Sequence, residues 1–286
     1  MRATLERMRI EGNISFIGAG SLAGALIRGL LSAGTYEAND IMATDLRADR
    51  LQELGQYHGI RTSKDNEQGA SRAAIVVLSV KPQVLPSVLP AVASALAPDT
   101  LVISLAAGIS TALVEAKLPH GTRVLRAMPN TPALVGSGAT ALALGTSSTD
   151  ADLRQAEQIF QSVGVTVRVE EALMDAVTGL SGSGPAYILL VLEALMNAGV
   201  QAGLPPSVAR TLSVQTVLGT ARLLDQSDEH PAALRDMVAS PAGTTMAGLR
   251  MLERGAVRSA FIEAVQCASQ RANELGRRAT ISLGKG

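Results

Sequence analysis

The chain has few aromatic residues and a single cysteine. Only 2% of its 286 residues are Phe, Tyr or Trp, and none is Trp, whereas 47% are hydrophobic. Its core must therefore be built from Ala, Val and Leu, which suits closely packed helices better than a β-sandwich. Cys267 is the only cysteine, so no internal disulfide can form, and this suits a reducing compartment. It lies in a helical run without a nearby histidine, which favours a core thiol over a nucleophile.

The sequence also lacks net charge and a long uninterrupted apolar run. It has 25 Lys and Arg residues against 25 Asp and Glu residues, which argues against a nucleic-acid partner. The longest apolar run, residues 186–200, contains Glu193 and Asn197, and we expect it to fall short of a membrane span. Residues 1–12 lack the apolar stretch of a signal peptide and are expected to be a disordered extension. These absences predict a soluble, cytoplasmic protein without a membrane partner.

The most informative stretch is residues 13–25, whose pattern predicts a strand, a tight turn and a helix. Gly18 permits the bend, Gly20 lets the backbone approach a pyrophosphate, and a small residue at Ala23 lets the helix pack on the strand. The N–H groups of Leu22 and Ala23 would face the phosphates. A glycine turn can also serve only to turn the chain. Its position directly after the first strand, however, predicts a dinucleotide site.

An acidic residue follows the second predicted strand, residues 41–44. A carboxylate at this place can accept hydrogen bonds from the adenosine ribose of NAD, whereas a nearby arginine favours the extra phosphate of NADP. The chain has both Asp45 and Arg47, so the motif leaves the two cofactors open. Asp45 can also cap a helix predicted to start near Ala48, and one carboxylate can serve both roles.

Strand and helix patterns alternate as far as residue 169. Such alternation predicts an α/β fold with a parallel, doubly wound sheet. The predicted strands are residues 14–17, 41–44, 74–80, 101–105, 123–127, 139–144 and 165–169. Beyond residue 170 the patterns are helical, at residues 185–203, 205–224, 232–238 and 256–277. We therefore predict an extension (1–12), a dinucleotide-binding domain (13–169) and a helical domain (170–286).

The helix predicted over residues 185–203 is apolar on nearly every side. A helix of this kind must be buried all round, and a helical region of this size can hardly achieve that alone. A partner subunit is the natural source of the missing cover, with a well-packed monomer as the alternative.

Three polar loops can carry chemistry. In the first, residues 128–132, two prolines hold Asn130 in a stiff frame. The second and third, residues 181–185 and 238–245, lie at predicted helix starts and offer N–H groups and hydroxyls to an anion. Taken singly, each loop is better explained by helix capping or turn formation.

Taken together, these segments resemble the pyrroline-5-carboxylate reductase family. The matching text runs in the family's order through nearly the whole chain after Gly12: Phe16-Ile-Gly-Ala-Gly, Ser79-Val-Lys-Pro, Arg126-Ala-Met-Pro-Asn-Thr-Pro-Ala-Leu-Val-Gly, Leu180-Ser-Gly-Ser-Gly-Pro-Ala-Tyr and Ser240-Pro-Ala-Gly-Thr-Thr. The resemblance implies a Rossmann-like, doubly wound, mostly parallel sheet followed by an all-helical dimerisation domain. It also implies reduction of the C=N bond of 1-pyrroline-5-carboxylate to L-proline, the final step of proline biosynthesis.

The motif and the resemblance together assign site residues. The cofactor, NADP with NAD possible, would be held by Gly18, Gly20, Ser21, Leu22, Asp45, Arg47, Asn66, Val80, Lys81, Ala106, Ala107 and Asn130. The substrate carboxylate would lie on backbone N–H groups of Ser240, Gly243, Thr244 and Thr245. The Thr245 hydroxyl, or water, would give a proton to the ring nitrogen. No metal is implied. The expected partners are the substrate, L-proline and further copies of the chain in a homodimer or larger homo-oligomer.

The chain departs from the family's usual text in three places. Gly20-Ser21-Leu22 stands where the family often has Gly-Asn-Met, so a contact of the Asn side chain is lost. Ala242 replaces a glycine of the signature and is therefore expected to avoid a glycine-only backbone conformation. Met237 stands where some relatives carry a polar residue.

Two other kinds of protein share the general pattern. One is another two-domain reductase, acting on a hydroxy acid or a flavin-like cofactor, and the signature at residues 240–245 argues against it. The other is a non-catalytic, dinucleotide-binding regulator, and the intact Thr245 and glycine turns argue against that.

Overall fold

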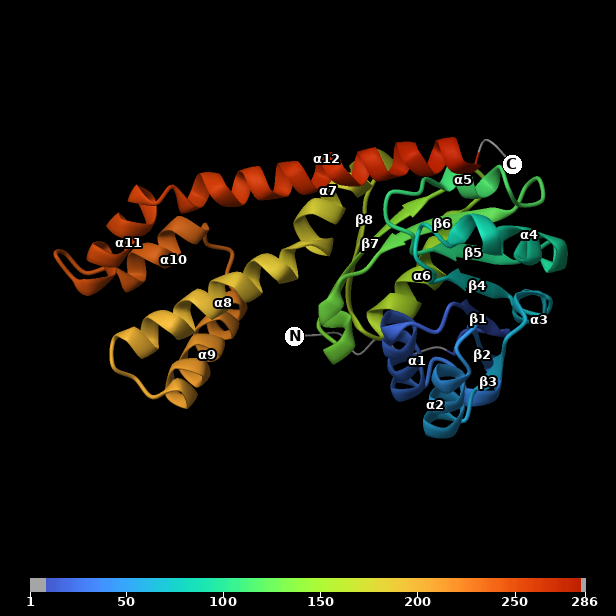
Figure 1. Cartoon of the computed structure of the whole chain (residues 1–286), viewed down its shortest axis with the longest axis horizontal. Coiled ribbons are helices and arrows are strands. Elements are labelled where there is room, and N and C mark those ends of the chain that lie inside the picture. The colour runs from blue at the N-terminus through green and yellow to red at the C-terminus, as the bar shows by residue number, and fades with distance from the viewer. Residues whose placement is uncertain (1–8, 284–286) are drawn as a thin grey trace. The chain divides into compact units, whose positions relative to one another are not determined.

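An eight-stranded sheet is the centre of the first part of the chain (Figure 1). The structure is a computed structural model, which describes residues 9–283 and their side chains as far as residue 279. The strand order is β3-β2-β1-β4-β5-β6-β7-β8. The strands are β1 (Ile14–Ile17), β2 (Ile41–Thr44), β3 (Arg61–Ser63), β4 (Ile75–Leu78), β5 (Leu101–Ser104), β6 (Arg123–Met128), β7 (Gly138–Leu144) and β8 (Gly164–Arg168).

All neighbouring strands are parallel except β6 and β7. A parallel connection needs a crossover of a dozen or more residues, whereas β6 and β7 are joined by the short 3-10 helix η2 (Thr131–Val135). The predicted doubly wound, mostly parallel sheet is therefore confirmed. The prediction missed β3, because its three residues, Arg-Thr-Ser, are partly or fully exposed at the sheet edge and carry no apolar pattern.

Helices cover both faces of the sheet, as a parallel sheet requires. Phe16 and Ile17 are both fully buried but point to opposite faces, so each joins a different core cluster. One face packs against α1 (Ser21–Ala33), α2 (Ala48–His58) and α6 (Asp150–Gln161). The other face packs against α3 (Asn66–Ala70), α4 (Leu85–Ala95) and α5 (Thr111–Glu115).

The residues just before β1 are packed rather than disordered. Ile10 is 5% exposed and belongs to the core cluster on the α1 face, and its N–H donates to the Thr35 carbonyl. Arg9 forms ion pairs with Glu37 and Asp40. The prediction of a disordered extension over residues 1–12 is thus wrong for residues 9–12, because Ile10 is an apolar anchor. Residues 1–8 lie outside the described part of the chain.

In the part of the chain that the structure describes, only helices follow β8. They are η3 (Glu171–Leu173), α7 (Met174–Val177), the π-helical turn η4 (Thr178–Gly182), α8 (Gly184–Gln201), α9 (Pro206–Asp225), α10 (Pro231–Val238), α11 (Thr244–Arg254) and α12 (Val257–Leu283). The predicted all-helical character of this region is therefore confirmed.

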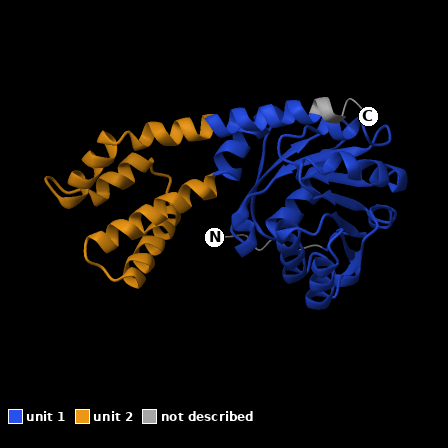
Figure 2. Ribbon diagram, in the orientation of Figure 1, with its two compact units in different colours: residues 1–183, 267–286 blue, residues 184–266 orange. Residues whose placement is uncertain are grey.

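Contacts divide the chain into two compact units, which Figure 2 colours separately. The first comprises residues up to 183 together with those from 267 onward, and the second comprises residues 184–266. The first unit extends beyond residue 169 because Met174 of α7 is fully buried against Ala141 and Ala143 of β7. The functional division at residue 169 stays a prediction.

Helix α8 buries none of its residues within the single chain. Ile188, Leu189 and Leu190 are 46%, 64% and 67% exposed, and Leu195 and Val200 are exposed as well. The helix thus has the apolar surface that the sequence predicted, and the second unit leaves it uncovered.

The continuous helical segment from Glu171 to Gln201 is long and apolar enough to cross a membrane, judged by length and composition only. The sequence analysis expected residues 186–200 to fall short of a span. That expectation was wrong about the length of the helical segment, because this segment begins upstream of residue 186 and includes η3, α7 and η4.

Cys267 is exposed in α12. The prediction of a core thiol was wrong, because α12 buries little of its surface within this chain, and Phe261 and Ile262 of the same helix are also exposed.

Candidate active site

The residues predicted to hold a cofactor gather at one edge of the sheet. Strands β1 to β6 run parallel, so their carboxyl ends share an edge. Each predicted segment follows one of them: residues 18–22 follow β1, 45–47 follow β2, Asn66 follows β3, 80–81 follow β4, 106–107 follow β5 and Asn130 follows β6. The strand order reverses at β1, which lies between β2 and β4. This is the switch point at which open α/β sheets bind ligands.

Two glycines of the turn after β1 differ in what they do. Gly18 has φ 100°, and a Cβ there would lie 2.9 Å from Val80 Cγ1 and 3.0 Å from the Ser79 carbonyl. Only glycine fits this bend. Gly20 has an ordinary φ of −65° as the N-cap of α1, and a Cβ there would meet no heavy atom within 4 Å. The chain therefore leaves open space at Gly20, directly before the helix N-terminus.

Side chains from the β2–α2 segment hold both backbone groups of Ala19. Its N–H donates to Asp45 Oδ2 at 2.9 Å, and its carbonyl accepts from Arg50 Nε at 2.8 Å. Arg50 also pairs with Glu53 at 2.5 Å. Sequence reasoning missed Arg50. In the structure, Gly24 leaves room for the Arg50 guanidinium, because a Cβ on Gly24 would overlap it.

Asp45 organises the turn and does not cap α2. The N-cap of α2 is Arg47, which makes no side-chain cap, whereas Asp45 Oδ1 accepts from Arg47 N at 3.0 Å and Arg47 Nε at 3.4 Å. Burial opposes ionisation of this carboxyl, but hydrogen bonds from the Arg47 and Ala19 N–H groups and the nearby guanidinium outweigh it and lower the pKa of Asp45. The Arg47 side chain is 58% exposed.

Asn130 and Asn66 are held in place by hydrogen bonds. Asn130 Oδ1 accepts from Ala139 N at 2.9 Å, and its Nδ2 donates to Ser181 Oγ at 3.2 Å. Asn130 therefore joins two of the three polar loops. Asn66 Oδ1 accepts from Thr44 Oγ1 at 2.6 Å, which links the start of α3 to the end of β2.

The residues predicted to bind substrate belong to the second unit and surround the start of α11. Gly243 is the N-cap, without a side-chain cap, and its own N–H donates to the Ser240 carbonyl at 3.0 Å. Thr245 lies one residue inside the helix, and its hydroxyl donates to the Val238 carbonyl at 3.2 Å. The hydroxyl is thus held near the first-turn N–H groups, and Thr245 is not the capping residue.

Ala242 has φ 57°, in the left-handed region that favours glycine. The expectation that it avoids such a conformation was wrong. The region is sparsely allowed for residues with a Cβ, so this alanine adopts it at some cost.

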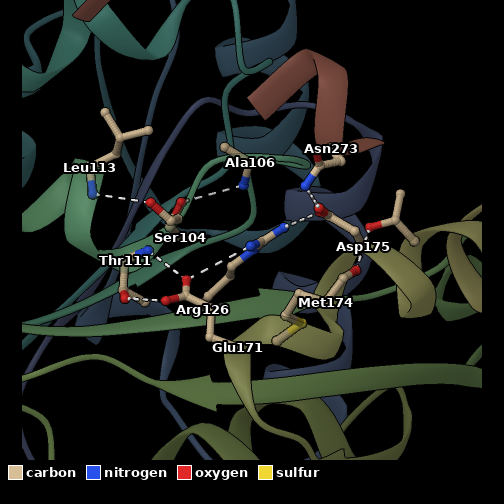
Figure 3. Close-up of polar contacts among 11 residues, drawn as sticks. Ser104, Ala106, Thr111, Leu113, Arg126, Glu171, Met174, Asp175 and Asn273 are labelled. Atoms are coloured by element: carbon tan, nitrogen blue, oxygen red, sulfur yellow. Dashed lines mark hydrogen bonds and ion pairs between the residues drawn. The ribbon is translucent and has the colours of Figure 1, made fainter. Parts of the chain in front are cut away.

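A partly buried charge cluster, missed by sequence reasoning, surrounds Arg126 of β6 (Figure 3). The Arg126 side chain, 6% exposed, lies 3.8 Å from Glu171 Oε1 and 3.5 Å from Asp175 Oδ1. Glu171 accepts from the Thr111 N–H at 2.6 Å and its hydroxyl at 2.7 Å. Asn273 Nδ2 donates to Asp175 Oδ2 at 3.1 Å. The sequence signal was an arginine inside an apolar strand.

The opposite edge of the sheet carries a cavity of about 590 Å³, lined by residues such as Asn13, Met42 and Arg61 at the amino ends of β1, β2 and β3. It contains none of the predicted site residues. No cluster of metal-ligating side chains is found among the residues that the structure describes.

An open, doubly wound sheet with a glycine turn after its first strand is typical of a dinucleotide-binding protein. Two family models match the chain. Residues 13–108 match the model described as NADP oxidoreductase coenzyme F420-dependent. Residues 171–275 match the model described as pyrroline-5-carboxylate reductase dimerisation.

Curated relatives match over nearly the full chain. A pyrroline-5-carboxylate reductase of Methanosarcina acetivorans is 45% identical over 265 residues, which are 93% of this chain and 98% of that protein. The enzyme of that name from Arabidopsis thaliana is 38% identical over 92% of this chain and 95% of its own. The chain belongs to the pyrroline-5-carboxylate reductase family.

Solved structures agree in fold. The pyrroline-5-carboxylate reductase from Coxiella burnetii has a TM-score of 0.86 at 40% identity, over 92% of this chain and 98% of its own. The pyrroline carboxylate reductase of Plasmodium falciparum, solved with NADP bound, has a TM-score of 0.86 at 28% identity, over 94% of this chain and 100% of its own.

Proposed function

We propose that this protein reduces the C=N bond of 1-pyrroline-5-carboxylate to L-proline with NADPH, NADH being an alternative cofactor. The proposal rests on the extent of the sequence match to relatives named for this activity. A relative named for this activity matches 93% of the chain at 45% identity, so both the sheet edge and the signature at the start of α11 fall within the match. The reaction is the final step of proline biosynthesis.

The residues at the carboxyl edge of the sheet fit a dinucleotide. The first-turn N–H groups of α1 have no side-chain cap, and such groups bind anions together with the helix dipole. Open space at Gly20 lets a pyrophosphate approach the backbone. The bound cofactor supplies the hydride. The chain supplies a rigid turn, since Asp45 and Arg50 hold both backbone groups of Ala19.

The contacts of Asp45 favour NADPH over NADH. Both of its carboxylate oxygens accept hydrogen bonds from this chain, one from Ala19 and the other from Arg47. It is therefore less available to a ribose hydroxyl. The exposed Arg47 guanidinium offers a cation to the 2′-phosphate of NADPH.

The start of α11 suits the substrate. We assign the substrate carboxylate to backbone N–H groups of the signature, chiefly those of Thr244 and Thr245, because Gly243 already donates to Ser240. Reduction adds a hydride to the imine carbon and a proton to the nitrogen. We assign the proton to the Thr245 hydroxyl or to a water molecule. The remaining task of the chain is to orient two reactants.

We also infer a homodimer or larger homo-oligomer in the cytoplasm, without a nucleic-acid or membrane partner. The exposed apolar surface of α8 and the dimerisation model over residues 171–275 support the assembly. The balanced charge argues against a nucleic-acid partner. The division at residue 169, between dinucleotide binding and substrate binding with dimerisation, belongs to the same proposal.

The test combines the purified protein, NADPH and 1-pyrroline-5-carboxylate. Reduced-nicotinamide absorbance should fall only when the substrate is present, and proline measured by mass spectrometry should appear mole for mole with the NADPH consumed. NADH is assayed in parallel. Tight NADPH binding without proline formation would identify a regulator instead. Oxidation of NADPH in the presence of a keto acid, which is reduced to a hydroxy acid, but not in the presence of 1-pyrroline-5-carboxylate, would identify a different reductase.

A further inference from the structure

The end of α12 and the loop that follows β5 touch through two glycines. Gly108 has φ 75°, and a Cβ there would lie 2.9 Å from the Ala272 carbonyl oxygen and 3.1 Å from Gly276 N. A Cβ on Gly276 would in turn overlap the Gly108 carbonyl oxygen. The two backbones therefore approach more closely than any side chain allows. Both segments belong to the first compact unit.

This loop occupies a particular place along the sheet edge. The ribose-side residues Asp45 and Arg47 follow β2, and the pyrophosphate turn follows β1, its neighbour. Continuing in the same direction leads past β4 to β5. A dinucleotide that crosses the edge from β2 through β1 thus has its nicotinamide half toward Ala106 and Ala107, the residues just before Gly108.

The other end of the loop is tied to α12 through polar contacts (Figure 3). Asn273 donates to Asp175, and Arg126 lies between Asp175 and Glu171. Glu171 accepts from both the N–H and the hydroxyl of Thr111, at the first residue of α5. The segment from Ala106 to Thr111 is therefore held at two points, by Gly276 directly and by Asn273 through this chain of contacts.

We propose that Gly276 and Gly108 form a positioning contact for hydride transfer, with Asn273 as a second, weaker positioning residue. The inference rests on the proposed function. The end of α12 sets the position of residues 106–108, and these in turn set where the nicotinamide ring lies. Neither residue touches the reacting atoms. A shift of about 1 Å in such a supporting segment can reduce the rate about a hundredfold.

The decisive variant is Gly276→Ala, which places a methyl group against the Gly108 carbonyl and displaces the loop. We expect kcat to fall about ten- to a hundredfold, with little change in the KM for 1-pyrroline-5-carboxylate. The isotope effect from NADPH deuterated at the transferred position should increase, because hydride transfer becomes slower than the other steps. NADPH should bind more weakly, whereas 2′-phospho-ADP-ribose, which lacks the nicotinamide, should bind as it does to the wild type.

The matched control is Gly55→Ala in α2. The chemical change is the same, but the nearest heavy atoms to the new Cβ lie at 3.8 Å, an ordinary contact. Its kinetic constants, isotope effect and ligand affinities should equal those of the wild type. Asn273→Ala is the second test variant, since it removes the hydrogen bond to Asp175 without adding bulk. It should move the same quantities in the same direction by a smaller factor.

A folded Gly276→Ala protein with wild-type kcat, isotope effect and affinity ratio of NADPH to 2′-phospho-ADP-ribose would overturn the proposal. If Gly276→Ala does not fold, the same three measurements on Asn273→Ala test the proposal, and wild-type values there would overturn it. Failure of the proposed function gives a different result, because the wild type and Gly55→Ala would then form no proline. The affinity ratio would still report whether α12 positions the loop.

Discussion

At Ala19, two side chains far along the chain determine the shape of a turn that the local sequence only permits. The Ala19 N–H is bound by Asp45 and its carbonyl by Arg50. These bonds matter because a pyrophosphate bound by backbone N–H groups needs a backbone that does not move. In the proposed site Asp45 holds the turn and Arg47 meets the cofactor phosphate, and mutations can distinguish these two roles.

Replacing Arg47 with Ala should weaken NADPH binding more than NADH binding, because only NADPH has a 2′-phosphate for the guanidinium. The measurement is the affinity of both cofactors by fluorescence titration. Arg154→Ala, which removes an exposed arginine from α6, is the control and should change neither affinity. Equal losses for NADPH and NADH would show that Arg47 does not contact the phosphate.

Asp45 should make folding stability depend on pH in the acid range. Its folded pKa lies below the ordinary value of 3.8 for an aspartate, so the ionised carboxylate stabilises the fold in full above about pH 4. The contribution is lost as the pH falls through the lower folded pKa. The difference in unfolding free energy between wild type and Asp45→Asn should therefore shrink below about pH 4, as measured by denaturant titration. A difference independent of pH would contradict this account.

Replacing Thr245 with Val should reduce turnover about ten- to a thousandfold, because a positioned proton donor is removed and water only partly replaces it. Cofactor affinity should hold, since the proposed cofactor contacts belong to the first unit. Losing the hydrogen bond to Val238 should cost about 0.5–1.5 kcal/mol of stability.

The control for Thr245 is Thr211→Val in α9, which removes a comparable hydroxyl-to-carbonyl bond of 3.0 Å. Turnover, cofactor affinity and melting temperature are measured on both variants. Full activity of the Thr245→Val protein, with only the small stability loss, would remove the hydroxyl from the mechanism.

At the scale of elements, distant residues complete helix ends that the local sequence leaves open. Helix α5 has only five residues, with Ser110 as its cap. Its first N–H, that of Thr111, donates to Glu171, which also faces the helix dipole as an anion. Glu171 also lies beside the buried Arg126. The short helix therefore depends on a segment sixty residues later in the chain.

Replacing Glu171 with Ala should lower the unfolding free energy by about 1.5–3 kcal/mol, because two hydrogen bonds to a charged group are lost and Arg126 keeps only Asp175. Denaturant titration measures the loss. Glu170→Ala, which removes an exposed neighbouring carboxylate, is the control and should change stability by less than about 0.5 kcal/mol. Equal stability losses for the two substitutions would show that the contacts of Glu171 with Thr111 and Arg126 do not stabilise the fold.

At the scale of the whole molecule, the helices after β8 leave an apolar surface that one chain does not cover. Helix α8 buries no residue, and exposed leucines and valines also occur on α9. Apolar side chains exposed on two helices that pack together indicate an interaction surface. The family model that matches these helices is described as a dimerisation region.

Light scattering should report at least a dimer at assay concentration. Leu190→Glu, at a position 67% exposed in the single chain, should shift the protein toward monomer and reduce activity, because a charge would be buried in the interface. Tyr57→Glu, at a position 79% exposed on α2, is the control and should leave the assembly intact. A wild-type protein that is active as a monomer would contradict the proposed assembly.

Local periodicity in the sequence was enough to predict the alternating strands and helices, the doubly wound sheet and the glycine turn. These features depend on residues a few positions apart, such as Gly18 next to the strand that ends at Ile17. The same reasoning missed β3, whose three residues are held in the sheet by pairing with β2 rather than by an apolar pattern. It also misjudged Ala242, because φ depends on the turn and not on the residue alone.

The sequence by itself thus determined the order and kind of most elements, and its motifs named the residues that the sheet edge brings together. Only the tertiary structure decided which distant groups meet. Asp45 binds Ala19 instead of capping α2, Arg126 lies between two carboxylates from a later segment, and Gly276 lies against Gly108. The physical reason is that periodicity reports which side of an element is apolar, whereas a contact between residues tens to more than a hundred positions apart depends on the path of the whole chain.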